Sequence, residues 1–184
     1  MRLAALLLCF VAPAAWALDF RPAEQKAAGE GGEYGYLQFY DKKRCVTYVP
    51  PARWDYSGRG GRFRLMPPNV TQADLDMEVQ TLRAPMPVES TDSKAFEALA
   101  RGALPEGAGR VETVGVTPNP LEIDGHRTIE VTLIYAFHGG MFKASYLYLA
   151  RGNELLRFRV ACKAADFDEL RQTFQASLHT LAGL

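Results

Sequence analysis

The chain has 184 residues, of which 48% are hydrophobic and 23% are charged, the composition of an ordinary globular domain. Lys plus Arg and Asp plus Glu both number 21, so no overall charge favours nucleic acid or an acidic membrane. This length predicts one domain that buries a core without a metal ion.

The first 17 residues have the pattern of a cleaved export signal. Arg2 gives a positive start, residues 3–11 are apolar, and Ala15-Trp16-Ala17 fits a small-x-small cleavage site. We therefore expect a mature protein that begins at Leu18 and is periplasmic or secreted.

Two other interpretations of this start stay open. An uncleaved membrane anchor would need about 20 apolar residues, and the run is shorter than that. A lipoprotein modified at Cys9 would need a small residue before the cysteine, where Leu8 stands. No later segment is apolar enough to cross a membrane, so we expect no stable membrane span after cleavage.

Cleavage would remove Cys9 and leave Cys45 and Cys162, each in a predicted strand. Two cysteines in an exported protein predict one disulfide, which would place the two strands side by side. The alternative is a pair of buried free thiols.

The first part of the mature chain predicts a lead-in followed by short strands. Residues 18–33 contain Pro and several Gly, so we expect a flexible segment there. Aromatic and β-branched residues predict a hairpin of strands over 34–40 and 44–49, with the domain running from 34 to 184. Residues 57–61 are predicted to form a flexible, glycine-rich loop, and 63–65 a short strand.

A strand is predicted over residues 75–80 because apolar and acidic residues alternate there. Its acidic side carries Asp74, Asp76 and Glu78, spaced roughly 6 to 7 Å apart along one face. We expect this side to be solvated. The alternative is that these carboxylates take part in carboxylate-dependent hydrolysis.

The second half predicts a helix from Asp92 or Ser93 to about 103, then a strand over 111–116. Three long strands follow, over 127–137, 141–150 and 155–162, with tight turns at Gly139-Gly140 and Gly152-Asn153. They predict an antiparallel meander.

The chain should end in an amphipathic helix over residues 166–181, with Asp166 and Glu169 at capping-box spacing. The predicted fold class is α+β: an antiparallel sheet with a C-terminal meander, flanked by helices.

The order of these elements resembles the PsbP-like superfamily, also called the Mog1/PsbP/DcrB fold. The local signals are Val49-Pro50-Pro51 with Trp54, Gly125 before the meander, and residues 174–178 in the last helix. The resemblance covers most of the mature chain. It implies an α/β/α sandwich and a binding or assembly role, and it brings no catalytic residues with it.

Catalytic, cofactor and metal motifs are not found in the sequence, so we predict no cofactor and no catalytic or metal site. There is no nucleophile elbow, P-loop, His-Glu-x-x-His or Cys-x-x-Cys. His126, His138 and His179 share no ligand spacing.

A basic, aromatic-rich region between residues 41 and 64 is the candidate partner-binding surface. It holds seven basic and two acidic residues, with aromatic residues between them, a mixture found at interface hot spots. Export argues against nucleic acid, so the predicted partner is a protein with an acidic surface. The candidate residues are Lys42, Lys43, Arg44, Arg53, Tyr56, Arg59, Arg62 and Arg64.

Two functions follow from these observations. The first is an exported, non-enzymatic binding or assembly protein of the cell envelope. The second is a hydrolase with an unrecognised carboxylate site, which a cleft that gathers Asp76, Glu78 and a histidine would favour. A third interpretation is that the charged regions are only solvated surface.

Overall fold

The computed structural model describes residues 18–29, 32–40 and 44–184. The predicted export signal, Lys42 and Lys43 lie outside these ranges. None of the helices within them is long and apolar enough to cross a membrane.

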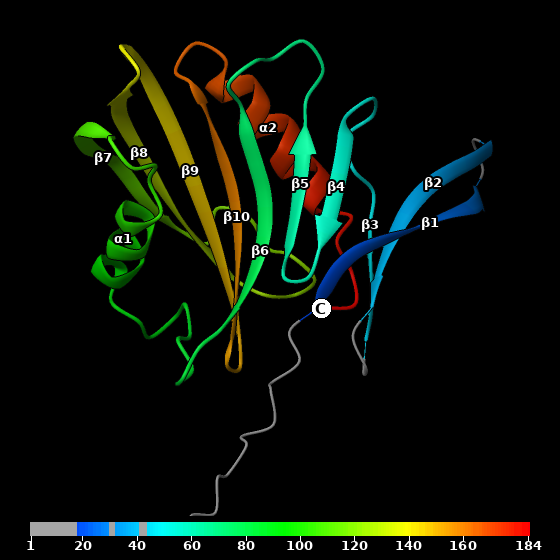
Figure 1. Ribbon diagram of the computed structural model, residues 1–184. Helices are drawn as coiled ribbons and strands as arrows, with labels where there is room; N and C mark the ends of the chain where they lie inside the picture. Colours follow the sequence, from blue (N-terminus) through cyan, green and yellow to red (C-terminus); the bar gives the residue numbers. More distant parts are fainter. Residues whose placement is uncertain (1–17, 30–31, 41–43) are drawn as a thin grey trace, which may run out of the picture.

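Ten strands in two sheets and two helices make up the described chain (Figure 1). The small sheet has the order β1-β2-β3, with β1 (Asp19–Gly29), β2 (Gly32–Tyr40) and β3 (Cys45–Tyr48). The large sheet has the order β4-β5-β6-β10-β9-β8-β7. Its strands are β4 (Asp55–Arg59), β5 (Arg62–Met66), β6 (Asp74–Thr81), β7 (Gly109–Pro118), β8 (Thr128–Phe137), β9 (Gly140–Arg151) and β10 (Glu154–Lys163).

All neighbouring strands pair antiparallel, and β8, β9 and β10 form the predicted meander. Strand β10 then pairs with β6, which joins the first and second halves of the chain in one sheet. The α+β class is therefore correct.

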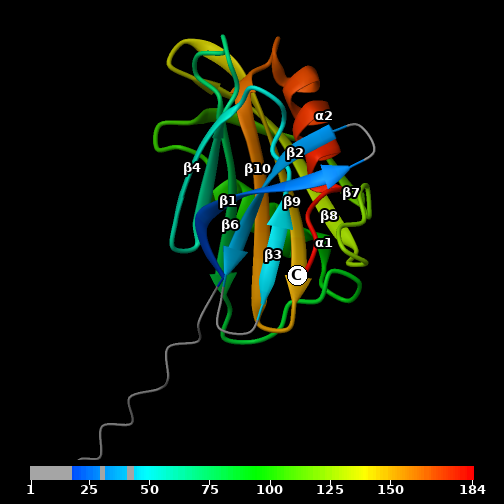
Figure 2. The ribbon, with the colours of Figure 1, turned by 90° about the vertical axis from the view of Figure 1, so that its right-hand side faces the viewer.

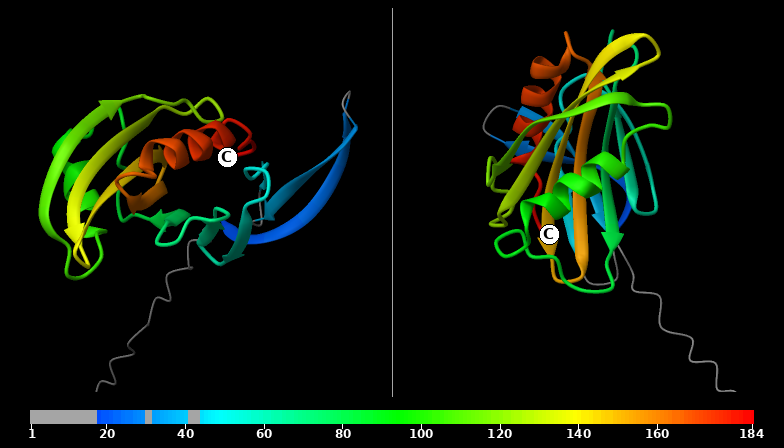
Figure 3. Two further views of the ribbon diagram at one scale, coloured as in Figure 1. Left: turned by 90° about the horizontal axis from the view of Figure 1, so that it is seen from above. Right: turned by 90° about the vertical axis from the view of Figure 1, so that its left-hand side faces the viewer.

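The two helices pack against opposite faces of the large sheet. Phe96 and Ala100 of α1 (Ser93–Gly102) join a core with residues of β8 and β9. Phe174 and Leu178 of α2 (Phe167–Leu178) join a second core with β6, β10 and the small sheet. Seen from above, the strands follow a curve with α2 on its inner side (Figure 3). We call the two sides the α1 face and the α2 face.

The helix starts agree only in part with the predicted caps. The Asp92 carboxylate accepts the backbone N–H of Lys94 at 3.0 Å, as its position before α1 predicts. Asp166 makes no side-chain capping bond, so the expected capping box at α2 does not form.

The predicted flexible segment over residues 18–33 is instead largely strand. Leu18 and Phe20 are each 1% exposed, and the Phe20 ring lies 5.2 Å from that of Phe39. The backbone N–H of Phe20 also donates to the carbonyl of Gly60 at 2.7 Å. The outer part of the β1–β2 hairpin projects from the body of the molecule, whereas its base completes the core (Figures 1 and 2).

The predicted flexible loop over residues 57–61 is also ordered. It is the end of strand β4 and a tight turn into β5, in which Arg59 pairs with Arg62. Gly58 is required because a Cβ atom there would lie 2.0 Å from the carbonyl oxygen of Phe20. Gly58 thus allows a close approach of β4 to β1.

A further turn differs from its prediction by one residue. The β8–β9 turn consists of His138 and Gly139, both with positive φ, and Phe137 pairs with Gly140. Two successive residues with positive φ form the turn type that suits a two-residue hairpin.

The predicted disulfide is not formed. Cys45 and Cys162 are both free, the first exposed on β3 and the second buried on β10. These strands belong to different sheets, so the expectation that they are neighbours is wrong.

Candidate functional site

The acidic side of β6 is covered rather than solvated, contrary to the sequence prediction. Asp76 has an exposed fraction of 0%, and Asp74 and Glu78 on the same side are partly buried. Their covering groups are arginines from the strands on either side. The alternating acidic residues of this strand are therefore one half of an ion-pair network that is largely buried.

Strand β10 supplies the most buried arginines of this network. Arg159 donates to Oδ2 of Asp76 from Nε at 3.0 Å and from Nη2 at 2.6 Å, and it also contacts Asp74. Arg157 pairs with Glu78, and its Nη2 lies 3.5 Å from Oδ1 of Asp76. Burial disfavours the charged form of Arg159 and lowers its pKa. The carboxylates of Asp76 and Asp74 together have the larger effect, so the pKa of Arg159 is raised above its ordinary value.

Strand β5 supplies arginines from the opposite side. Nη2 of Arg62 lies 2.7 Å from Oδ2 of Asp76, and Nη2 of Arg64 lies 3.4 Å from Oδ1 of Asp74. Both side chains are about half exposed. They form the outer side of the network, next to the sheet edge at β4.

Strand register explains why these residues meet. Side chains alternate between the two faces of a strand, and residues opposite one another share a face. The register therefore forms two rows of side chains on one face of the sheet.

The first row runs across β5, β6, β10 and β9 and consists of Arg64, Asp76, Arg159 and Tyr146. Arg62, Glu78, Arg157 and Tyr148 form the neighbouring row. We call the charged members of both rows, together with Asp74, the ladder.

The ladder has one more positive than negative charge. It contains four arginines and three carboxylates: Arg62, Arg64, Arg157, Arg159, Asp74, Asp76 and Glu78. The shortest ion-pair distance of Arg64, 3.4 Å to Asp74, is longer than the shortest ion-pair distance of each of the other three arginines, and its side chain is the most exposed, at 56%. The surplus charge therefore lies mainly at Arg64.

Two tyrosines of β9 end the rows with hydroxyl groups that have no acceptor. Tyr146 and Tyr148 are almost fully buried, and the O–H donor of each has no acceptor among the described residues. Burial raises the pKa of both groups above the ordinary value, although neighbouring arginines lower it in part. Both hydroxyls are neutral donors at physiological pH, and a buried donor without a partner is costly.

A pocket of about 480 Å³ opens beside the first row. One wall is aromatic: the ring centre of Phe142 lies 5.8 Å from those of Tyr135 and Phe137. Arg64 and Arg159 are on the other side, and Tyr146 also borders the space. A second hollow of about 440 Å³ lies between α1 and the row that contains Arg157 and Tyr148.

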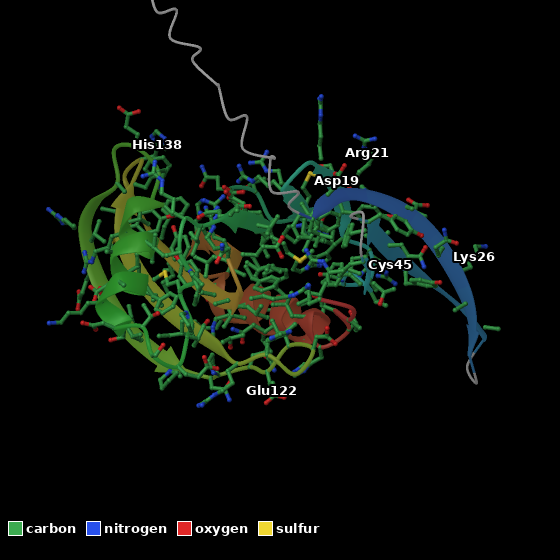
Figure 4. All side chains as sticks on the ribbon, turned by 90° about the horizontal axis from the view of Figure 1, so that it is seen from below. Asp19, Arg21, Lys26, Cys45, Glu122 and His138 are labelled. Carbon is green, nitrogen blue, oxygen red and sulfur yellow. The ribbon has the colours of Figure 1, made fainter. Side chains whose placement is uncertain are left out.

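The pocket also gathers a histidine and a carboxylate, His138 and Asp74. His138 is exposed in the β8–β9 turn, near the end of the molecule opposite Lys26 on the projecting hairpin (Figure 4). Asp74 accepts bonds from Arg64 and Arg159, so it acts as their counter-ion. The cleft of Asp76, Glu78 and a histidine that would favour a hydrolase is not formed, since Asp76 is enclosed by arginines and neither it nor Glu78 borders the pocket.

The predicted partner-binding residues that lie in the described ranges do not form one surface. Arg62 and Arg64 join the ladder, and Arg59 lies exposed beside them. Arg44 forms a partly buried ion pair with Glu154, at 2.9 Å. Arg53 and Tyr56 border a different hollow, beside Trp54 and the β1–β2 hairpin, where the Tyr56 hydroxyl donates to Glu24 at 2.6 Å.

Sequence reasoning missed the residues that complete the site. The sequence predicts meander strands over 141–150 and 155–162, but it assigns no role to Tyr146 in the first or to Arg157 and Arg159 in the second. The available signal was the alternation of Arg with apolar residues along 155–160, which matches the acidic alternation of 74–79. Complementary alternation of this kind predicts that two strands pair.

No group of three or more His, Cys, Asp or Glu side chains in the described ranges is arranged to hold a metal ion. What the site offers is a set of guanidinium and phenol donors beside an aromatic wall.

No protein-family model matches the chain, and no curated protein matches it either. Among solved structures, it is similar to a protein of unknown function from Pseudomonas aeruginosa, at 10% identity and a TM-score of 0.46. That match covers 86% of this chain and 96% of the other. A structure from Bacteroides thetaiotaomicron gives 11% identity and a TM-score of 0.48, over 76% of this chain and 45% of the other. Likenesses at this level assign no function.

Proposed function

We propose that the protein is an exported, non-enzymatic binding protein of the cell envelope, and that it binds its partner on the α1 face over β4, β5, β6 and β10. The observation that carries the proposal is the ladder's surplus charge at Arg64, beside a pocket bordered by Tyr146, whose O–H donor has no acceptor among the described residues. Export to the envelope rests on the signal pattern of residues 1–17.

The charge of this face favours an acidic protein partner. Arg59 and Arg64 are exposed on adjacent strands, with Ser57 between them on β4. Exposed arginines steer and orient a partner of opposite charge, and salt weakens such contacts. Lys42 and Lys43 are retained as candidate contacts from the sequence alone.

The carboxylates support binding rather than hydrolysis. A general acid must hold a proton and release it to the substrate. Asp74, Asp76 and Glu78 are instead each bonded to at least one arginine. They serve as fixed counter-ions that position the guanidinium groups.

We also propose that the fold is the α/β/α sandwich of the PsbP-like superfamily. The packing of α1 and α2 on opposite faces of the large sheet supports this. An experimental structure that superposes poorly on members of that superfamily would count against it.

Capture experiments with matched variants test the binding role. Mature protein would be immobilised and incubated with envelope extract, as the wild type and as the double variant Arg59→Glu/Arg64→Glu. A control with Arg110→Glu and Arg127→Glu makes the same change of charge at exposed positions outside the ladder. Arg62 is left intact because its guanidinium contacts the buried Asp76.

The proposal predicts that an acidic partner is retained by the wild type and the control, is lost from the Arg59/Arg64 variant, and is released by salt. Equal retention by all three proteins would show that this face is only solvated surface.

A further inference from the structure

We propose that the pocket beside Arg64 binds a small amphipathic carboxylate, with an aromatic or short alkyl body and one carboxylate group. The proposal rests on the binding role proposed above and names the ligand chemistry of the same face. It is argued from the walls of the pocket, its charge and its unbonded donor.

The aromatic wall fits the body of such a ligand. Tyr135, Phe137 and Phe142 come from the end of the β8–β9 hairpin, and their ring centres lie 5.8 to 6.5 Å apart. Met66 adds an exposed apolar side chain on the opposite side. A pocket of about 480 Å³ is within the range of small-molecule sites, and aromatic rings stack on such walls at these separations.

The charge of the pocket fits one carboxylate. Arg159 is held closely by both Asp76 and Asp74, whereas Arg64 has only the longer contact to Asp74, at 3.4 Å, and is the more exposed of the two guanidinium groups. A planar guanidinium pairs with a carboxylate through two parallel N–H donors. A dianion is disfavoured because its second charge would lie near Asp74, which also borders the pocket.

The Tyr146 hydroxyl is an independent indication of a ligand. The residue is 0% exposed and borders the pocket; the Arg159 guanidinium interacts with its oxygen, but its O–H donor has no acceptor among the described residues. Buried polar groups are nearly always hydrogen-bonded, so a donor left open beside a cavity indicates an acceptor that occupies it. A ligand oxygen would be that acceptor.

A set of three matched probes tests the proposal on the mature protein. The first is 4-phenylbutyrate, the second its neutral amide, and the third acetate, which has the charge without the body. Chemical-shift titration of the isotope-labelled protein reports both affinity and place. We expect 4-phenylbutyrate to bind roughly tenfold more tightly than the amide, as one charged hydrogen bond predicts. The chemical-shift changes caused by 4-phenylbutyrate should be confined to residues of β5 and the β8–β9 turn. Acetate should cause no chemical-shift changes there.

Variants identify the groups that recognise the ligand. Arg64→Gln should weaken the binding of 4-phenylbutyrate roughly tenfold, so that the acid and the amide bind with similar affinity. Tyr146→Phe should weaken both probes. Arg127→Gln, at an exposed site away from the pocket, should change neither. Thermal unfolding of each variant checks that it is folded.

Equal binding of the acid and the amide, shifts outside the pocket, or no binding at millimolar concentration would overturn the ligand proposal. If that happens while partner capture still depends on Arg59 and Arg64, only the ligand chemistry is wrong. If partner capture is also independent of these arginines, the binding role itself fails.

Discussion

Arg159 on β10 donates twice to one oxygen of Asp76 on β6, with exposed fractions of 8% and 0%. The two residues are opposite each other in the strand register although 83 positions apart in the chain. This pair joins the early and late halves of the sheet. It also sets the position of the arginines that face solvent.

Replacement of Asp76 by Ala should destabilise the protein by about 3–5 kcal/mol, because it leaves buried arginine charge uncompensated. Urea unfolding followed by circular dichroism measures the change. Asp55→Ala, at an exposed position on β4, should alter the free energy of unfolding by less than about 0.5 kcal/mol. Equal effects of the two substitutions would mean that the ladder does not stabilise the fold.

Replacement of Phe20 by Ala should cost about 3–5 kcal/mol, as for other buried aromatic side chains. The same unfolding measurement tests whether the first strand belongs to the core. Gln25→Ala, exposed on the same strand, should have little effect. If Phe20→Ala also leaves the free energy of unfolding nearly unchanged, β1 is the flexible segment that the sequence predicts.

Thiol reactivity should differ sharply between Cys45 and Cys162, the two cysteines in the described ranges. Cys45 is exposed and should react with a disulfide reagent in the folded protein. Burial raises the pKa of the Cys162 thiol to about 12, so it should react only after unfolding. If thiol titration of the unfolded, unreduced protein finds no free thiol, the two cysteines form the disulfide that the sequence predicts.

Alkaline pH should weaken the fold in a defined window. Burial raises the pKa of Tyr135 to about 12, from an ordinary value of 10.0. The unfolded chain therefore loses this proton first, and the stabilisation present below pH 10 is lost as the pH rises towards 12. Tyr135→Phe should reduce the fall in the free energy of unfolding across this window. An unchanged slope would show that Tyr135 is not buried in solution.

Several elements could be predicted from the sequence because their signals are local. Alternating apolar residues and tight turns mark the meander, and Asp92 marks the start of α1. Helix α2 follows from its apolar stripe. The first strand does not follow from the sequence because Pro22 and three glycines in residues 18–33 favour a flexible segment, whereas the burial of Leu18 and Phe20 depends on contacts with distant residues.

The site could be predicted only in part, because it depends on pairing between distant strands. Arg62 and Arg64 are among the residues that the sequence predicts for partner binding, but the alternation of their partners on β6 predicts a solvated face. The pairing of β6 with β10 brings Arg157 and Arg159 to the same carboxylates. Without that register, neither the ladder's surplus charge nor the pocket follows from composition.

Site-specific photo-crosslinking tests the central claim most directly. A photoreactive residue would replace Ser57, between the exposed arginines of β4 and β5, or Glu122, which lies at the opposite edge from His138 in Figure 4. In cells that export the protein, we predict a discrete crosslinked adduct from position 57 and none from position 122. Adducts of equal yield from both positions, or an adduct from position 122 alone, would contradict a binding site on the α1 face.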